Sequence, residues 1–239
     1  MIINFHFREN TYDASIFDFV VRQNEYELGD LSGKRILDVG GHIGCFALKA
    51  LRCNAEKVVS FEPSQENYEL AASNLAGAAG KAEVIRAAVS RSDKQVEVRF
   101  EPSDHAPNSG GGCSVTGLGE IVPSISLDDA IEEHNANWLK IDAEGAEFPA
   151  LYTCTKLDQI ETIVGEFHNG VGTEGMGVFM FEENTPEFLE DFKGRLSMEK
   201  LAEFLKEQGF RVLYEYTAGK QLGLFWASKN FDCLLVEPA

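Results

Sequence analysis

A glycine-rich run that follows a short apolar stretch constrains this chain more than any other feature. Residues 36–39 are Ile-Leu-Asp-Val, and Gly40, Gly41 and Gly44 follow directly. An amphipathic segment over residues 45–52 comes next. This order predicts a strand, a tight turn and a helix, which is a unit that brings bare backbone and a helix N-terminus close to a small ligand.

A second apolar run indicates what kind of ligand this unit would hold. Residues 57–61 are mostly apolar and lead into Glu62, which lies about 20 residues after the glycine turn. At that spacing, the second strand of a nucleotide-binding fold presents a carboxylate to a ribose diol. With Asp38 near the end of the first strand, the two acids predict a site for a nucleoside-containing cofactor.

The rest of the chain alternates short apolar runs with helical periods. Strands are expected over residues 36–39, 57–62, 83–89, 138–142, 160–167, 210–216, 222–228 and 232–237, with a further polar strand over 94–100. Helices are expected over residues 14–23, 43–52, 127–134, 146–154 and 198–208, and from residue 64 onward. This alternation predicts an α/β fold with a mostly parallel sheet and helices on both faces, and the missing helices between the final strands predict an antiparallel last pairing.

The chain of 239 residues is interpreted as one domain. Residues 1–30 are expected to form an N-terminal extension that covers one edge of the core. Residues 101–119 and 169–195 are expected to be loop insertions, either lids or surface excursions. In the helix after Pro63, Ser64 is the expected cap. An apolar stripe of Tyr68, Ala71, Ala72 and Leu75 is expected to face the sheet.

Composition limits the partners of this chain. Lys and Arg total 21 and Asp and Glu total 39, so the net charge of −18 disfavours nucleic acid as a partner. The five scattered cysteines fit neither a disulfide framework nor a thiolate zinc site. With no apolar run long enough for a membrane span and no signal-peptide pattern, we expect a cytoplasmic protein without a membrane partner. The oligomeric state stays open, a dimer included.

Two classes of nucleoside cofactor compete for the glycine turn. A dinucleotide-binding oxidoreductase uses the pattern G-x-G-x-x-G, which Gly40, Gly41 and Gly44 do not form. Asp38, two residues before Gly40, would also repel a pyrophosphate. A sulfonium cofactor with a cationic amino group suits an acidic crevice, and S-adenosylmethionine (SAM) is such a molecule.

Four motifs, in order and spacing, resemble those of the FkbM-type methyltransferases within the class I methyltransferase superfamily. They are residues 36–44, 61–63, 86–90 and 139–147, and the last carries the pattern K-I-D-x-E-G-x-E. The resemblance covers about residues 30–239 and departs from the family where Gly41 and His42 replace an Ala-Asn pair. It implies a Rossmann-like, seven-stranded sheet with strand order 3-2-1-4-5-7-6, the last strand being antiparallel.

The resemblance also implies where SAM, and its product S-adenosylhomocysteine (SAH), would bind. The implied cofactor-binding residues are Asp38, Gly40, Gly41, His42, Gly44, Glu62, Pro63, Ala87, Ala88 and Asp142. The glycines would wrap the methionine portion, and Glu62 would bind the ribose hydroxyls. Ala87 and Ala88 would border the adenine, and Asp142 would lie near the reactive methyl group.

Transfer of a methyl group to a hydroxyl requires in-line positioning and a base. The candidate catalytic residues are Asp142, His168, Glu144 and Glu166. Asp142 and His168 rank first, because a histidine can change charge near neutral pH. Glu144 and Glu147 are expected at the positive end of a helix, with Lys140 pairing with one of them.

The predicted function is SAM-dependent O-methylation of a hydroxyl on a sugar, a polyketide or another small molecule. Methylation of nitrogen or of a macromolecule on the same fold, a non-catalytic SAM-binding protein and an NAD-dependent dehydrogenase are the alternatives. No metal is expected in the site. A divalent ion held by Asp142, His168 and Asn169 stays open as an alternative.

Overall fold

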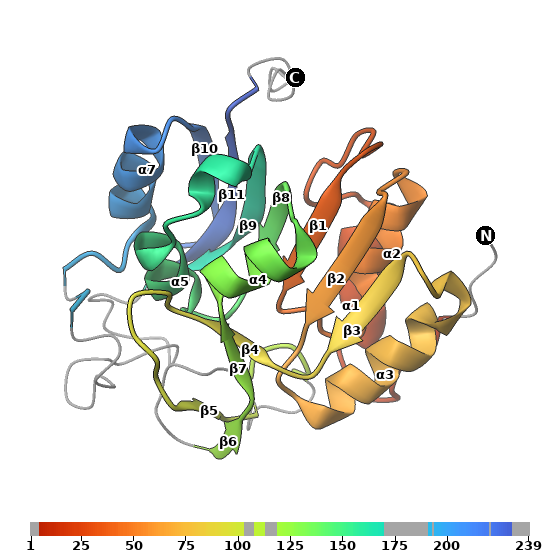
Figure 1. Cartoon of the computed structure of the whole chain (residues 1–239). Coiled ribbons are helices and arrows are strands. Elements are labelled where there is room, and N and C mark those ends of the chain that lie inside the picture. The colour runs from red at the N-terminus through yellow and green to blue at the C-terminus, as the bar shows by residue number, and fades with distance from the viewer. Residues whose placement is uncertain are drawn as a thin grey trace.

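A seven-stranded sheet forms the centre of the molecule (Figure 1). The computed structural model describes residues 5–102, 108–112, 119–169, 191–192, 194–219 and 221–230. The strands of the sheet are β1 (Arg35–Val39), β2 (Lys57–Phe61), β3 (Ala82–Ile85), β8 (Trp138–Ile141), β9 (Thr162–His168), β10 (Arg211–Ala218) and β11 (Leu222–Ser228). Their order is β10-β11-β9-β8-β1-β2-β3. Counted along the chain, this is 3-2-1-4-5-7-6, so the predicted order is confirmed.

The directions of the strands also match the prediction. From β3 to β9 all neighbouring strands are parallel. Strand β11 runs antiparallel to both β9 and β10. The expected strand over residues 232–237 lies outside the described residues.

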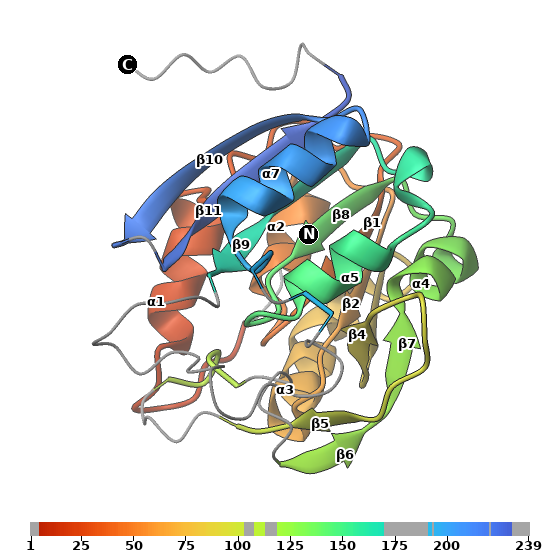
Figure 2. The same cartoon turned by 90° about the vertical axis from the view of Figure 1, so that its left-hand side faces the viewer.

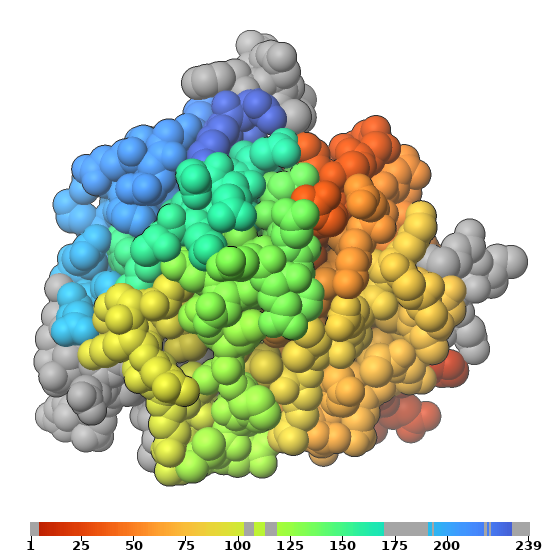
Figure 3. Space-filling view, in the orientation of Figure 1, coloured from red at the N-terminus to blue at the C-terminus, as the bar shows by residue number. Residues whose placement is uncertain are grey.

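Helices cover both faces of the sheet. Figures 1 and 2 show α4 (Leu127–His134), α5 (Glu147–Thr153) and α7 (Met198–Glu207) on one face, with α1 (Asp13–Phe17) and α2 (Cys45–Arg52) on the other. Successive residues of β1 explain this arrangement, because Ile36 packs into the core beside α2 while Leu37 packs into the core beneath α4 and α5. Strands that are apolar on both faces are typical of a parallel sheet buried between helices. Figure 3 shows α4, α5 and α7 closing over their face.

Helix α3 (Gln65–Leu75) follows most of the predicted stripe, since Ala71 and Leu75 are buried and Tyr68 is half-buried. Ser64 caps it as expected, its side chain accepting a hydrogen bond from the backbone N–H of Asn67 at 3.4 Å. Ala72, however, is exposed, whereas Asn74 is buried. The Asn74 amide donates to the carbonyl of Ile43 at 3.0 Å. This face of α3 covers loop backbone as well as side chains, and buried carbonyls there require a polar partner.

Three other predicted elements differ in extent from the prediction. The strand expected over residues 83–89 is split, because after β3 the chain turns and β4 (Ala88–Ser90) pairs with β7 (Ser124–Ser126) outside the main sheet. The polar strand forms as β5 (Val98–Phe100), paired with β6 (Glu120–Val122). The helix expected over residues 14–23 is α1 followed by a π-helical turn, Asp18–Arg22.

The N-terminus of α4 and the C-terminus of α7 are also capped. Ser126 caps α4 by accepting from the backbone N–H of Asp129 at 3.0 Å, and Gly209, with a φ of 88°, follows the end of α7. No helix in the described part of the chain combines the length and the apolar character that a membrane span requires.

Candidate active site

A cavity of about 750 Å³ opens at the carboxyl ends of the central strands. This is where ligands bind in open α/β sheets. Gly40 follows β1, Glu62 follows β2, Asp142 follows β8 and Glu166 lies near the end of β9, and all four line the cavity. The sequence-predicted residues His42, Pro63, Ala87, Ala88, Glu144 and His168 also line it. Asp38, Gly41 and Gly44 are not among the lining residues.

Close packing of strand ends explains why the turn after β1 requires glycine. Gly40 has a φ of 80°, and a Cβ added there would lie 1.8 Å from the carbonyl oxygen of Asp142. A Cβ on Gly41 would lie 2.9 Å from the Cβ of Ser60. The backbone N–H groups of Gly40 and Gly41 both donate to the carbonyl of Phe61 at 3.0 Å. The turn thus joins the ends of β1, β2 and β8, and Gly40 brings backbone to the cavity wall.

Lys140 anchors the glycine turn through hydrogen bonds to backbone carbonyls. The side chain is 4% exposed, and its Nζ donates to the carbonyls of Gly40 at 2.6 Å and Val39 at 3.3 Å. The same Nζ lies 3.3 Å from an oxygen of Asp38 and 3.7 Å from one of Asp142. Burial disfavours the charged form, but the two carboxylates hold the pKa of Lys140 above its usual value. The expected pairing of Lys140 with Glu144 or Glu147 is therefore wrong, because the side chain points from β8 toward β1.

Glu62 presents a buried carboxylate at the end of β2. It is 5% exposed, and it accepts hydrogen bonds from the backbone N–H groups of His42 at 2.8 Å and Ser64 at 2.9 Å. The amide of Asn67 adds a third bond at 3.4 Å. Burial raises the pKa of Glu62 to about 7. A carboxylate has about four lone-pair sites, so Glu62 is held in place and can still accept from a ligand.

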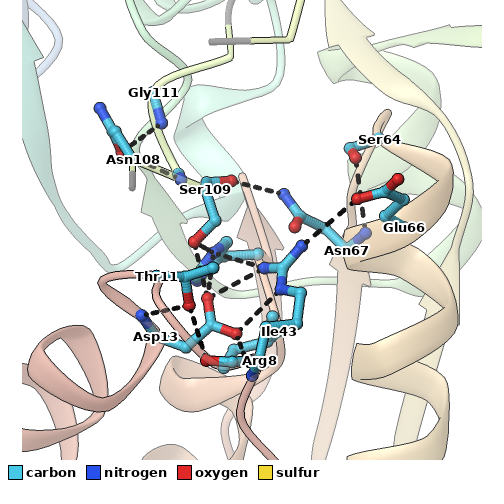
Figure 4. Close-up of polar contacts among 12 residues, drawn as sticks. Arg8, Thr11, Asp13, Ile43, Ser64, Glu66, Asn67, Asn108, Ser109 and Gly111 are labelled. Atoms are coloured by element: carbon cyan, nitrogen blue, oxygen red, sulfur yellow. Dashed lines mark hydrogen bonds and ion pairs between the residues drawn. The ribbon is translucent and has the colours of Figure 1, made fainter. Parts of the chain in front are cut away.

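The N-terminal segment reaches this part of the cavity, which the sequence did not indicate. We name the residues Arg8, Asp13, His42 and Ser109 the Asp13 network, and Figure 4 labels Arg8, Asp13 and Ser109 of this set. Asp13 is fully buried and accepts from the Nε and Nη2 of Arg8, each at 2.9 Å. The hydroxyl of Ser109 donates to Asp13 at 2.6 Å and lies 3.1 Å from the Nε2 of His42. The network thus connects the N-terminal segment, the glycine turn and the loop over residues 108–112.

Burial and hydrogen bonds determine the ionisation states of Asp13 and His42 in the Asp13 network. Burial opposes ionisation, but bonds from Arg8 and Ser109 lower the pKa of Asp13 to about 2. Burial lowers the pKa of His42 to about 4, so its ring is neutral near pH 7. Ser109 also accepts, through its carbonyl, from the amide of Asn67 at 3.1 Å. The expectation that residues 1–30 only cover one edge of the core is therefore incomplete.

A second group of side chains gathers at the ends of β8 and β9. His168 is 5% exposed, and its Nε2 lies 3.2 Å from an oxygen of Glu144 and 4.0 Å from one of Glu166. Its Nδ1 lies 3.2 Å from an oxygen of the fully buried Glu147, which also accepts from the backbone N–H of His168 at 2.7 Å. Asp142 completes the group, and the hydroxyl of Tyr26 donates to it at 3.4 Å.

Like charges dominate this group. Burial raises the pKa of Glu144 to about 7 and that of Glu166 to about 8, with Asp142 adding to both shifts. Burial disfavours a charged imidazole, but Glu144 and Glu147 raise the pKa of His168 well above its usual value. A protonated ring is a poor base, which disfavours the general-base role predicted for His168.

The alternative metal-ligand set from the sequence, Asp142, His168 and Asn169, lines this same cavity. The side-chain oxygen of Asn169 also accepts from the backbone N–H of Met198 at 2.8 Å, at the start of α7. Glu144 is a further candidate, since Asp142, Glu144 and His168 each offer one ligand atom within 4.8 Å of the others. Sequence reasoning missed this because Glu144 and Gly145 have positive φ angles, which fold the chain back toward β9.

Comparison with solved structures identifies methyltransferases of low sequence identity. The chain is similar to a SAM-dependent methyltransferase from Aquifex aeolicus (13% identity, TM-score 0.44), covering 86% of this chain and 87% of that one. It is similar to precorrin-6y C5,15-methyltransferase from Geobacter metallireducens (10% identity, TM-score 0.48), covering 95% of each chain. For TrmK from M. capricolum in complex with SAH, identity is 10%, the TM-score is 0.47, and coverage is 87% of this chain and 68% of that one.

Comparison of sequences gives the family. No curated protein sequence matches the chain. The model of the methyltransferase FkbM domain matches residues 38–212. This match extends from Asp38 through the glycine turn and the strand-end acids into β10. The chain therefore belongs to the FkbM methyltransferase family.

Proposed function

We propose that this protein is a SAM-dependent O-methyltransferase that acts on a hydroxyl of a sugar, a polyketide or another small molecule. The observation that carries the proposal is the arrangement of Gly40, Glu62 and Asp142 around one cavity, in a member of the FkbM family. These residues follow three adjacent parallel strands, as a nucleoside cofactor lying across the sheet edge requires.

The residues of the cavity fit SAM. Glu62 would accept hydrogen bonds from the ribose hydroxyls, and Ala87 and Ala88 would border the adenine. Gly40 and Asp142 would contact the methionine portion. Five carboxylates line the cavity, those of Glu25, Glu62, Asp142, Glu144 and Glu166, and the described lining includes no Lys or Arg. Such a wall suits a cationic ligand better than a pyrophosphate. When bound, SAM supplies a methyl group on a positively charged sulfur.

The acceptor would bind on the side of the cavity where β8 and β9 end. Leu222, which pairs with His168 at the end of β9, provides apolar surface there, and Tyr12 and Phe19 also line the cavity. Such surface suits a small organic molecule. Glu166 faces the same space, and no described residue donates a hydrogen bond to its carboxylate. We assign Glu166 as the base, acting in its ionised form, which its raised pKa of about 8 makes prevalent at mildly alkaline pH. The hydroxyl proton would move to Glu166, and the methyl group would pass from the sulfur of SAM to the acceptor oxygen, leaving SAH.

Calorimetric titration tests cofactor binding. The native protein is expected to bind SAM and SAH and not NAD. Glu62→Gln is expected to lose about tenfold or more in affinity for SAH, because hydrogen bonds to a charged acceptor contribute about 1.5–3 kcal/mol. Glu66→Gln is the matched control, since Glu66 lies four residues later in the first turn of α3, with its side chain 85% exposed. Preferential binding of NAD would contradict the proposal, and unchanged affinity in Glu62→Gln would remove the ribose assignment.

Methyl transfer itself is measured with SAM labelled on the methyl group and a panel of hydroxyl and amine acceptors. We expect label on oxygen in the product and equimolar SAH. Label on nitrogen, or no turnover by a protein that binds SAM, would contradict O-methylation.

A further inference from the structure

We propose that Asp142, Glu144 and His168 bind a divalent metal ion that also contacts the hydroxyl of the acceptor. This proposal rests on the proposed function, because it places the ion beside the methyl group that the cofactor would present. We name these three residues the β8–β9 triad. They differ from the set that the sequence suggested, in which Asn169 replaced Glu144.

The distances within the β8–β9 triad suit one ion. Oxygen and nitrogen ligands at about 2.1 Å from a metal, at right angles to each other, are about 3.0 Å apart. The Nε2 of His168 lies 3.2 Å from an oxygen of Glu144. One ligand atom from each of the three residues lies within 4.8 Å of the other two. Small rotations of the two carboxylates, which are 21% and 25% exposed in Glu144 and Asp142, would close the set.

Glu147 provides a second and separate indication. Metal-binding histidines generally donate their other ring N–H to a carboxylate or carbonyl, which fixes the orientation of the ring. The Nδ1 of His168 lies 3.2 Å from an oxygen of Glu147, a fully buried carboxylate. Gly145 holds this carboxylate from the other side, its backbone N–H donating at 2.8 Å. The Nε2 of His168 is thereby directed at Glu144, as a metal ligand would be.

The surroundings of the triad leave negative charge for an ion to offset. Glu25 and Glu166 line the same cavity, and Glu166 lies 4.0 Å from His168. Lys140 is the nearest described lysine, but its Nζ is committed to the carbonyl of Gly40 and lies closer to Asp38 than to Asp142. In sequence, no Lys or Arg occurs between Lys156 and Lys193, so the undescribed segment over 170–190 adds none.

The donor set indicates which ions fit. Two carboxylates and one imidazole suit an octahedral divalent ion such as Mn²⁺, Fe²⁺ or Mg²⁺, with remaining positions for water and substrate. Because His168 carries a proton on Nε2 when the ion is absent, binding of the ion would release that proton to solvent. A hydroxyl bound to such an ion loses its proton more readily. The proton would pass to Glu166, and the oxygen would stay oriented for attack on the methyl carbon. The ion is not consumed, and no electron transfer is involved.

Mn²⁺ binding tests the triad without an acceptor. The electron paramagnetic resonance signal of free Mn²⁺ is followed as native protein is added, and we expect loss of about one equivalent. Glu144→Gln and His168→Ala are expected to weaken binding at least about tenfold. Glu133→Gln, an exposed acid on α4, is the matched control and should bind like the native chain. If His168→Ala does not fold, Glu144→Gln alone decides the question, because its side chain is partly exposed.

Glu147→Gln sharpens the test, because Glu147 is a positioning residue in this proposal. Loss of an orienting partner typically reduces metal affinity about 10- to 100-fold although all three ligands remain. The proposal would be overturned if the native protein bound Mn²⁺ no more tightly than Glu144→Gln does. It would also be overturned if His168→Ala kept the native affinity for Mn²⁺. SAH titration of the same variants separates the two proposals. If the native protein binds SAH but not Mn²⁺, the metal site alone is rejected. If the native protein does not bind SAH, the proposed function is rejected.

Discussion

The two sides of the cavity differ in the hydrogen-bond donors and cations that their acidic groups contact. On the proposed cofactor side, at the ends of β1 and β2, Glu62 lines the cavity and Asp38 and Asp13 lie outside its lining. All three are buried, and each accepts hydrogen bonds from defined partners. On the proposed acceptor side, at the ends of β8 and β9, Glu144 and Glu166 face the cavity, and His168 is the cation that contacts them among the described residues. The first side is arranged before any ligand arrives. The second carries uncompensated charge, which proteins retain at sites that a ligand completes.

The largest expected effect comes from removing the central cation of the cofactor side. Lys140→Met leaves Asp38 buried without its counter-ion and the carbonyl of Gly40 without its donor. Breaking a buried ion pair in this way typically costs about 3–5 kcal/mol. Urea denaturation is expected to show that the free energy of unfolding falls by this amount. Lys200→Met, which removes an exposed lysine on α7, should leave the free energy of unfolding nearly unchanged. A loss below about 1 kcal/mol would show that the turn does not depend on Lys140.

Asp13→Asn is expected to have the next largest effect, with a characteristic dependence on pH. The pKa of Asp13 is about 2 in the folded chain against 3.8 for the free side chain. Because the folded pKa is lowered, its contribution is complete above pH 3.8 and is lost as the pH falls toward 2. That shift corresponds to about 2 kcal/mol.

Urea denaturation of native protein and of Asp13→Asn across this pH range is the measurement. The gap between their free energies of unfolding should be widest near pH 6 and should narrow below pH 3.8. A gap that does not change with pH would show that the ionised Asp13 carboxylate does not stabilise the fold.

The smallest expected effect on stability is on the acceptor side and has the opposite sign. Glu166→Gln removes one of several closely spaced carboxyl groups, which repel one another when ionised. It breaks no hydrogen bond from a described residue. Thermal unfolding is therefore expected to shift upward slightly or not at all. Methyl transfer should nevertheless fall about 100-fold or more, because a general base typically contributes at least that factor. A clear loss of stability, or full activity, would contradict the contrast between the two sides.

Much of the fold followed from the sequence, because local patterns determine it. The apolar runs around Leu37, Val59 and Leu139 specify buried parallel strands, and the structure pairs these residues across β1, β2 and β8. The acids that follow these strands, Glu62 and Asp142, reach the cavity for the same reason. The split at Ala88 was not predictable, since its partner strand, β7, is weakly apolar and lies 36 residues away.

The missed parts of the site depend on contacts between distant segments. Ser109 and Asp13 are 96 positions apart, and neither carries a local signal for the hydrogen bond that joins them. Lys140 was assigned a wrong partner because alternation along a strand gives the face of a side chain and not the neighbour it reaches. Glu144 was not recognised as a possible metal ligand, because the backbone after Asp142 folds back through two residues with positive φ.

The central claim is that the cofactor side is a SAM site prepared by its own hydrogen bonds. A crystal structure of the protein with SAH tests it directly. We expect the ribose hydroxyls on Glu62, the adenine beside Ala87 and Ala88, and the sulfur near Gly40 and Asp142, with the Asp13 network unchanged. An adenosine bound instead against Glu144 and His168, or a ribose out of reach of Glu62, would contradict it.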